Sequence, residues 1–510
     1  IPLGATSEGH LENAEAIYPG QRGNLVGVRT FAGDDEHATP QHALMIGKTG
    51  SGKSMLCIDL LIQTLAYYGF TVILDEGFSY QCYAQLCHPD SKPVVIEPNG
   101  GSTFNYLDTR GLPISSMQIA DASAMALLLV GHHADEDRNR LRLAHLVHGI
   151  NQLYQDTYEQ WRNDRPEIVE RVARHALAIQ QWHRERMPSG ANFVDAFVSF
   201  RDWSVEHPDE AESLFEEFEE EAVSRMMQAE DESTSVLRDL SFAYMSPDKM
   251  PTHRQFQELM SMPTGQGKEA EEIKTLATFL EPWCSYGNYG PLLDGVSNVS
   301  LDSSLAHFEF GCIPESAREL RSVASFLITN YVRNEIMKRP RGLRKRVILE
   351  ELSAFLMNRE GERITQEFFE RMRKYNCWVL AIIQQYARLC ESPVRKSVMG
   401  NIRSAYILKQ RDREEVDLLG DALGLQEVTK QAILNFPEPA SMGNNAYSSF
   451  VYYEAKDHRP TIAIGRHVAS AEMLYTSASS GEHVDQRNKA LRGSEDVSQS
   501  VLGQIYRSNN

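Results

Sequence analysis

The stretch Gly47-Lys-Thr-Gly-Ser-Gly-Lys-Ser54 decides the fold of this chain. It has the pattern G-x-x-x-x-G-K-[ST], in which backbone N–H groups of a glycine-rich loop surround a phosphate group at the start of a helix. An apolar run at residues 43–47 leads into it, and an amphipathic segment at residues 53–68 follows it. The pattern therefore lies between a strand and a helix, as this kind of site requires, and it predicts a nucleoside triphosphate site.

The expected role of each loop residue follows from the chemistry of phosphate binding. We expect Lys53 to reach the β- and γ-phosphates of ATP, and the Ser54 hydroxyl to bind the Mg²⁺ that accompanies the nucleotide. The predicted cofactors are therefore ATP and Mg²⁺. The predicted nucleotide-binding residues are Gly47, Lys48, Thr49, Gly50, Ser51, Gly52, Lys53 and Ser54.

ATP hydrolysis also requires a carboxylate at the end of a neighbouring strand, and the sequence offers two candidate pairs. One short apolar run ends at Asp75 and Glu76, and another ends at Glu350 and Glu351. The first pair has the more usual Asp-Glu composition. Distance along the chain does not distinguish the two pairs.

The residues that follow each pair favour the second one. After Glu351 come a helix and the strand 378–383, which ends in the amide Gln384. Ring-forming P-loop ATPases have this layout: the carboxylate polarises the attacking water and the amide senses the γ-phosphate. We therefore predict Glu351 as the general base, Gln384 as the sensor, and Glu350 as a metal-site residue together with Ser54. The first pair remains the alternative.

The predicted fold class is α/β, with a RecA-like core whose mostly parallel sheet is interrupted by an all-helical insertion. Strand-like runs alternate with helical stretches at first and resume near residue 306, whereas apolar residues between these parts recur at three- and four-residue spacing. The expected domains are a lead-in segment or linker (1–40), a first core part (41–112), the insertion (113–275), a second core part (276–468) and a polar tail (469–510).

Composition and charge limit the classes of function. The chain has 70 acidic and 51 basic residues, a formal net charge of −19, which does not favour direct binding of nucleic acid. The longest apolar stretch, residues 122–130, is far shorter than the ~20 residues that cross a bilayer, so we expect no transmembrane segment. The seven cysteines include no CxxC pair, which is typical of a reducing cytoplasm. Because the chain begins with Ile1, we expect further residues upstream.

Several more motifs follow the loop in a fixed order. They are Phe104-Asn105, the box from Tyr286 to Gly295, the strand end Glu350-Glu351, Arg373-Lys-Tyr-Asn376 and Gln384. Together with the loop and the Asp75 strand, this set resembles the large cytoplasmic ATPases of type IV secretion and conjugation systems. These are the VirB-class, TraC/TrbE-like members of the HerA–FtsK superfamily. One departure is Glu350, because family members usually carry Asp there, and Glu is one methylene longer.

The resemblance covers roughly residues 40–112 and 276–465. It implies an ATP-hydrolysing motor that energises assembly of, or substrate transfer through, a type IV secretion machine. It further implies a hexameric homo-oligomer that works with inner-membrane components and further ATPases of the machine. The implied location is cytoplasmic and peripheral to the bacterial inner membrane, and the family's N-terminal domain would precede this chain.

In such a ring, a neighbour's arginine can stabilise the charge of the transition state. We expect this role of Arg373, which begins the family-like Arg-Lys-Tyr-Asn, and name Arg371 as the second candidate.

Two other functions remain open from the sequence. A DNA-translocating pump or coupling protein of the HerA–FtsK type would need a basic ring lumen, and the acidic composition does not favour this. A nucleotide-gated scaffold without catalysis would explain why Glu stands at position 350 in place of Asp.

Overall fold

The structure of the chain is a computed structural model. It describes residues 11, 13–21, 23–31, 40–98, 100–187, 192–228, 232–263, 267–314, 316–356, 359–439, 447–456, 460–470, 473 and 476, with the side chains of 232–235, 354–355 and 359–360 left out. Apart from residues 469, 470, 473 and 476, the predicted tail lies outside this description, as does part of the predicted lead-in segment.

The contacts within the chain define two compact units. Unit 1 comprises Ile1–Ile96, Ser300–Pro314 and Gly342–Asn510, and unit 2 comprises Glu97–Val299 and Glu315–Arg341. Unit 2 thus takes in the predicted insertion together with residues on either side of it. The predicted domain boundaries remain a prediction.

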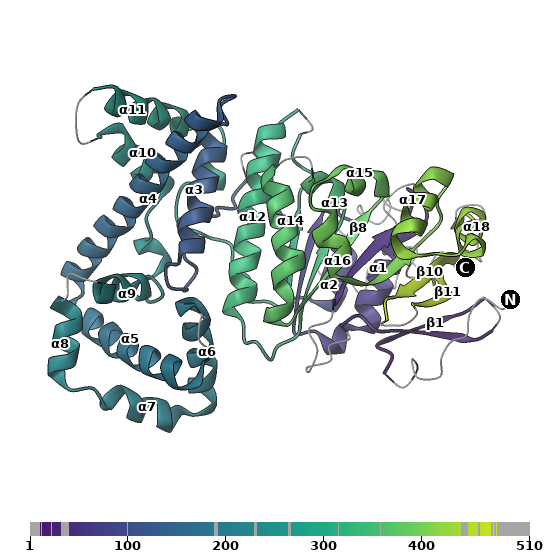
Figure 1. The fold of residues 1–510 in the computed structure, drawn as a ribbon, viewed down its shortest axis with the longest axis horizontal. Coiled ribbons are helices and arrows are strands. Elements are labelled where there is room, and N and C mark those ends of the chain that lie inside the picture. The colour runs from purple at the N-terminus through teal and green to yellow at the C-terminus, as the bar shows by residue number, and fades with distance from the viewer. Residues whose placement is uncertain are drawn as a thin grey trace. The chain divides into compact units, whose positions relative to one another are not determined.

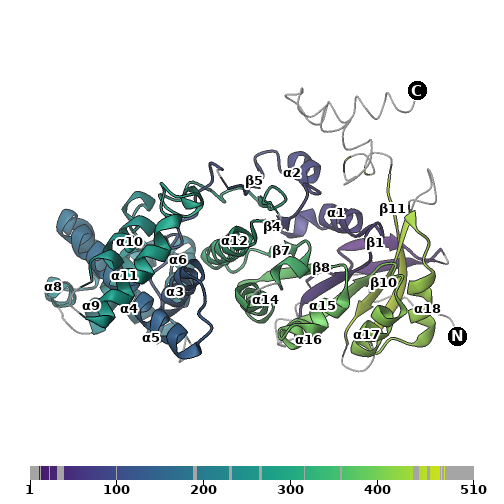
Figure 2. The same ribbon diagram turned by 90° about the horizontal axis from the view of Figure 1, so that it is seen from above.

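Unit 1 is built on one large sheet (Figures 1 and 2). Its strands are β3 (His42–Ile46), β4 (Phe70–Asp75), β5 (Val94–Val95), β6 (Leu305–Glu309), β7 (Lys345–Leu349), β8 (Cys377–Ile383), β9 (Ile402–Ile407), β10 (Tyr447–Glu454) and β11 (Thr461–Val468). The nine strands have the order β11-β10-β9-β3-β8-β7-β4-β6-β5. The runs predicted at residues 43–47 and 378–383 form β3 and β8, each of which begins one residue earlier than predicted.

Within the series β9-β3-β8-β7-β4-β6-β5, all neighbouring strands are parallel. Strand β10 is antiparallel to both β9 and β11. Every residue of β3, β4, β6, β7 and β8 is buried. This burial explains why these segments read as nearly continuous apolar runs, since helices cover both faces of a parallel sheet. The predicted α/β fold with a mostly parallel sheet is confirmed, and the carboxyl ends of the parallel strands share one edge.

The helices of unit 1 lie on both faces of this sheet, with α1 and α2 on one face and α14, α15 and α16 on the other (Figure 2). Their bounds are α1 (Lys53–Gln63), α2 (Gln81–Cys87), α13 (Leu352–Phe355), α14 (Arg359–Arg371), α15 (Tyr386–Glu391), α16 (Arg395–Asn401), α17 (Arg413–Leu423) and α18 (Glu427–Asn435), with short 3₁₀ turns at η2 (Leu65–Tyr67) and η6 (Met372–Tyr375).

The predicted lead-in segment contains an antiparallel hairpin that the sequence analysis did not predict. Its strands are β1 (Ala16–Pro19) and β2 (Leu25–Val28). Tyr18 and Val28 are buried in the core of unit 1, and Gly20 forms a bridge to Gly465 of β11. This part of the chain therefore extends the core and is more than a linker. Its strands are only four residues long, too short to show a clear alternation in the sequence.

Unit 2 consists of helices, as predicted for the insertion, and its described residues between 116 and 280 contain no strand. Its elements are α3 (Ser116–Val130), α4 (Glu136–Asp164), α5 (Pro166–Arg186), α6 (Phe193–Glu206), α7 (Pro208–Glu216), α8 (Glu220–Gln228), α9 (Glu232–Ser241), η3 (Pro247–Lys249), α10 (His253–Ser261), α11 (Lys268–Leu280), η4 (Glu281–Trp283), η5 (Gly290–Leu292) and α12 (Arg318–Lys338). Nowhere in the described part of the chain does a helix combine the length and the apolar character needed to span a membrane.

The family-like box from Tyr286 to Gly295 forms a tight turn in unit 2. The Asp294 carboxylate accepts hydrogen bonds from the backbone N–H groups of Ser285 (2.6 Å) and Arg254 (2.9 Å). A Cβ atom at Gly290 would lie 1.8 Å from the carbonyl oxygen of Cys284, so no larger residue fits there. Asp294 and Gly290 of this box thus stabilise the backbone of the turn.

One buried arginine connects the elements that position the loop and the carboxylates. Arg346 of β7 is fully buried and donates to the hydroxyls of Thr71 (2.8 Å) and Thr64 (2.7 Å). It also donates to the Leu61 carbonyl (3.2 Å) and the Tyr83 hydroxyl (3.3 Å). These partners belong to β4, to α1 and the residue after it, and to α2, so a single guanidinium connects all three to β7.

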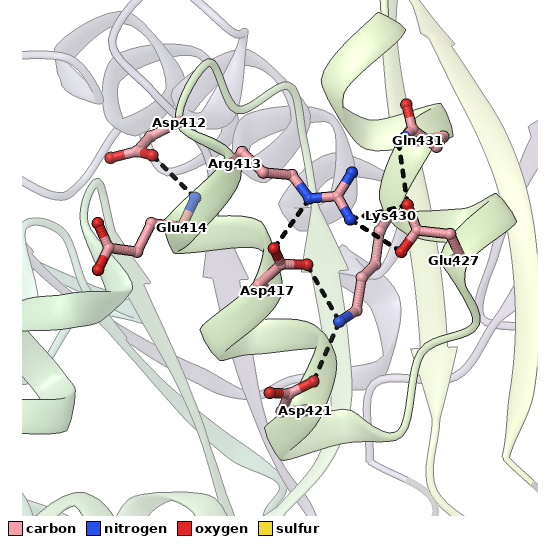
Figure 3. Close-up of polar contacts among 8 residues, drawn as sticks. All are labelled: Asp412, Arg413, Glu414, Asp417, Asp421, Glu427, Lys430 and Gln431. Carbon is pink, nitrogen blue, oxygen red and sulfur yellow. Dashed lines mark hydrogen bonds and ion pairs between the residues drawn. The ribbon is translucent and has the colours of Figure 1, made fainter.

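We predict that Arg346→Ala lowers the free energy of unfolding by about 3 kcal/mol, because it leaves a cavity and unpaired buried acceptors. The matched control is Arg413→Ala, since Arg413 lies in an exposed network between α17 and α18 and pairs with Asp417 (2.9 Å) and Glu427 (2.8 Å) (Figure 3). We expect this control to leave the free energy of unfolding almost unchanged, because exposed ion pairs contribute little to stability. Urea unfolding followed by circular dichroism measures both values, and equal costs would contradict the role of Arg346.

Candidate functional site

The glycine-rich loop connects β3 to α1, as predicted. Gly50 and Gly52 have φ angles of 76° and 94°, a left-handed conformation that favours glycine. A Cβ atom at Gly52 would also lie 2.0 Å from the Ser448 hydroxyl oxygen. The loop can therefore follow this tight path only with glycine at these positions, and it ends where the first N–H groups of α1 lack acceptors within the helix.

The Lys53 side chain is folded back over the loop. Its ammonium group donates to the carbonyl oxygens of Gly47 (2.8 Å) and Lys48 (3.3 Å), and only 8% of the residue is exposed. Burial lowers the pKa of Lys53, whereas the charges of Glu350 and Glu351 act in the opposite direction. A buried cation thus lies inside the loop, with the two carboxylates of β7 near enough to stabilise its charge.

The strand order brings the predicted carboxylates to the loop. Strand β8 separates β3 from β7, and Glu350 and Glu351 directly follow β7. The Ser54 hydroxyl, in the first turn of α1, donates to Glu350 Oε1 at 3.0 Å. The two residues that we predicted for the metal site are therefore in direct contact, although 296 positions separate them in the sequence.

The predicted sensor joins the loop to the predicted base. The Thr49 hydroxyl donates to Gln384 Oε1 at 2.7 Å, and Gln384 Nε2 donates to Glu351 Oε2 at 2.6 Å. Gln384 directly follows β8, the strand between β3 and β7. Because its side-chain amide has an acceptor oxygen and a donor nitrogen, Gln384 can contact the loop and the carboxylate at the same time.

The backbone at Glu351 is strained. This residue has φ 57° and ψ 61°, in the left-handed region that non-glycine residues seldom adopt. The conformation turns the chain sharply out of β7 and into α13. Such outliers cost of order 1–3 kcal/mol and are concentrated at functional sites.

Glu350 lies in an environment that favours its neutral form. Burial raises its pKa to about 7, and the charge of Asp75 acts in the same direction. Hydrogen bonds from Tyr80 and Ser54, and the charge of Lys53, oppose this shift. Tyr80 donates to Glu350 Oε2, a contact that no sequence motif indicated.

The alternative pair lies one strand farther from the loop. Asp75 ends β4, beyond β7, and its carboxylate accepts a hydrogen bond from the Tyr80 N–H (3.3 Å) and contacts His307 Nε2 (3.2 Å). Asp75, His307 and Glu309 are all buried, and within the described residues they form a group close enough to share an ion. The structure thus brings Asp75 together with β6, whereas Glu350 and Glu351 face the loop.

The two predicted arginines lie at the end of the sheet where the parallel strands begin, whereas the loop lies at the carboxyl end of the strands. Arg371 ends α14 and Arg373 lies in η6, so both precede β8, whereas Gln384 follows it. Burial lowers the pKa of His42, at the start of β3, to about 3, and the nearby charge of Arg373 contributes to the decrease. Neither arginine is brought to the loop of its own chain, so a role in catalysis would require a second copy and remains a prediction.

A further contact on the loop was not predicted. Lys48 forms an ion pair with Glu438, which also pairs with Arg411 (2.9 Å). Hydrogen bonds from Lys48, which has the larger effect, and from Arg411 lower the pKa of Glu438 to about 2. Glu438 follows α18 and is 390 positions from Lys48, so no local pattern could have indicated it.

The loop and its neighbours fit both predicted cofactors. Lys53 and the unpaired N–H groups at the start of α1 offer positive charge and donors to phosphate oxygens. The Ser54 hydroxyl and the Glu350 carboxylate are oxygen ligands, which Mg²⁺ prefers.

Comparison with known protein families identifies the chain. Residues 217–501 match the TraG P-loop domain, and the chain belongs to this family. The matched region includes β6 to β11 and hence the carboxylates of β7 and the amide after β8. A search of curated protein sequences found no match.

One solved structure shows a similar fold. VirB4 of Thermoanaerobacter pseudethanolicus matches with a TM-score of 0.58 and 14% identity, over 90% of this chain and 97% of that one, so the chain has a VirB4-like P-loop fold. Two structures of the plasmid coupling protein TrwB match less well. TrwB in complex with the GTP analogue GDPNP has a TM-score of 0.43 and 14% identity, over 84% and 86%. TrwB in complex with ADP and Mg²⁺ has a TM-score of 0.39 and 14% identity, over the same shares.

We predict that Lys53→Ala abolishes nucleotide binding, because the loop keeps its backbone N–H groups but loses its buried cation. Bound MgATP should raise the melting temperature of the parent chain and leave that of the variant unchanged. Lys396→Ala, which removes an exposed lysine of α16, serves as the matched control. Isothermal titration that finds ATP affinity near the parent value for Lys53→Ala would contradict the assignment of this loop.

Proposed function

We propose that the chain hydrolyses ATP at the loop between β3 and α1. The observation that carries this proposal is the hydrogen-bonded path from Thr49 through Gln384 to Glu351. It joins a loop residue beside the phosphate position to a carboxylate that can act on water. A loop that only bound nucleotide would have no need of a carboxylate and an amide aligned in this way.

Each residue has a distinct role in the proposed reaction. Lys53 binds the β- and γ-phosphates and stabilises the charge that develops on them. Glu351 accepts a proton from the attacking water, and Gln384 orients that carboxylate and senses the γ-phosphate. Ser54 and Glu350 would hold Mg²⁺, which when bound neutralises phosphate charge.

We further propose that this activity energises assembly of, or substrate transfer through, a type IV secretion or conjugation machine. The TraG P-loop family and the VirB4-like fold support this proposal. The expected assembly is a hexameric ring in the cytoplasm, attached to the bacterial inner membrane through other subunits. In the ring, Arg373 or Arg371 of one copy would act on the nucleotide of the next.

We predict that Glu351→Gln binds ATP about as well as the parent but hydrolyses it ~10²–10⁴-fold more slowly, because the base can no longer accept a proton. Asp75→Asn is the matched control: it also neutralises a carboxylate at a strand end, but keeps an acceptor oxygen for Tyr80. We expect less than a ~10-fold loss from Asp75→Asn. A coupled assay of phosphate release measures both rates.

The opposite result, in which Asp75→Asn stops hydrolysis and Glu351→Gln does not, would exchange the roles of β4 and β7. If neither variant nor the parent released phosphate while all of them bound ATP, the chain would be a nucleotide-gated scaffold.

We predict that Glu351→Gln with MgATP forms rings that electron microscopy can resolve, because nucleotide stays bound where subunits meet. A separate measurement, of ATP turnover by the parent chain, distinguishes a motor for protein transfer from a DNA pump. For a DNA pump, double-stranded DNA would stimulate turnover of the parent chain with a steep dependence on salt. Given the net charge of −19, we expect no such stimulation.

A further inference from the structure

We propose that Tyr80 is a positioning residue that holds the Glu350 carboxylate in place beside Ser54. This contact restrains the additional rotatable bond that a glutamate side chain has compared with aspartate. The inference rests on the proposed function, since it concerns how the chain binds the cation that accompanies ATP.

The two oxygens of Glu350 are held from two sides. Ser54 of α1 donates to Oε1 (3.0 Å), and the hydroxyl of Tyr80, which precedes α2, donates to Oε2. Tyr80 is fully buried, so its hydroxyl has no competing water. A glutamate side chain has one more rotatable bond than aspartate, and a second hydroxyl removes the freedom that this bond adds.

The backbone before Tyr80 is held by a buried carboxylate of β6. Glu309 accepts hydrogen bonds from the N–H groups of Gly77 (2.8 Å) and Phe78 (2.6 Å). Both residues have positive φ angles, 112° for Gly77 and 58° for Phe78. A positive φ is uncommon for a residue such as Phe78, and the turn is stabilised because two backbone N–H groups donate to one buried carboxylate.

The end of β4 completes the support. Asp75 accepts a hydrogen bond from the Tyr80 N–H (3.3 Å) and contacts His307 of β6 (3.2 Å). Asp75 and His307 are buried, and neither extends to the loop between β3 and α1 through these contacts. The group formed by Asp75, His307 and Glu309 therefore acts on the turn that carries Tyr80, and Tyr80 acts on Glu350.

The difference in length between glutamate and aspartate provides the test. An aspartate at position 350 would hold its carboxylate about 1.5 Å closer to the β7 backbone, one C–C bond shorter, and would lie farther from the Tyr80 hydroxyl. The effect of removing that hydroxyl should therefore depend on which acid stands at position 350. A purely structural role of Tyr80 would give the same effect with either acid.

The experiment measures how tightly Mn²⁺ binds to the full chain loaded with a non-hydrolysable ATP analogue, by electron paramagnetic resonance at one fixed pH. The four proteins are the parent, Tyr80→Phe, Glu350→Asp and the double variant. We expect Tyr80→Phe to weaken Mn²⁺ binding ~5-fold, because the longer glutamate side chain loses the hydroxyl that restrains it opposite Ser54.

In the Glu350→Asp background, Tyr80→Phe should change the affinity less than ~2-fold. The matched control is Tyr83→Phe, whose hydroxyl lies on α2 but contacts His88 (3.2 Å) and Arg346 (3.3 Å). It should leave the Mn²⁺ affinity unchanged in both backgrounds. If Tyr80→Phe does not fold, site-specific incorporation of 3-fluorotyrosine at position 80 replaces it, because this nearly isosteric phenol is a stronger hydrogen-bond donor and should change the Mn²⁺ affinity only when glutamate stands at position 350.

The inference alone is overturned if the parent binds the analogue and Mn²⁺ normally but Tyr80→Phe leaves the Mn²⁺ affinity unchanged. It is also overturned if Tyr80→Phe weakens binding equally in both backgrounds. A parent chain that binds no nucleotide at all would overturn the proposed function, and the role of Tyr80 with it.

Discussion

The separation between the loop strand and the carboxylate strand governs the whole site. Strand β8 lies between β3 and β7, and neighbouring strands are about 4.8 Å apart, so the loop and the carboxylates face each other across roughly 10 Å. This distance separates the backbones, and side chains bridge it: the Ser54 hydroxyl donates to Glu350 Oε1 at 3.0 Å. Lys53 and Ser54 extend from one side and Glu351 from the other, and Gln384 extends from the strand between them.

The loop and the carboxylates keep their distance from each other only if the strands and helices that carry them are held together. The Arg346 guanidinium connects β7 to β4, α1 and α2 at the amino end of the strands, whereas the reactive groups lie at the carboxyl end. These four partners are hydroxyl groups and a carbonyl group, so none of them carries a negative charge, and their dipoles stabilise the positive charge of Arg346. Removing one such partner leaves buried groups unpaired, which explains why we assign so much of the local stability to this residue.

The turn after β4 makes contacts that its sequence does not indicate. Asp75 follows an apolar strand and resembles a catalytic carboxylate, yet it meets His307 and the backbone of Tyr80. Together with Glu309 it shapes the turn that places Tyr80 against Glu350. Asp75 of β4 and Glu309 of β6 thus hold the backbone of the turn that carries Tyr80. The Tyr80 hydroxyl in turn contacts one oxygen of Glu350, which follows β7.

The sequence by itself determined the loop, the parallel strands, the helical insertion and the preference for Glu350 and Glu351 over Asp75. These features depend on local patterns: glycine spacing, apolar runs of strand length and helical periodicity. Only the tertiary structure revealed the hairpin at β1 and β2, the Tyr80–Glu350 and Lys48–Glu438 contacts, and the position of Arg371 and Arg373 at the far edge of the sheet. The physical reason is that such contacts join residues 270 or 390 positions apart, and the order in which strands pair, which no local pattern encodes, decides which of them meet.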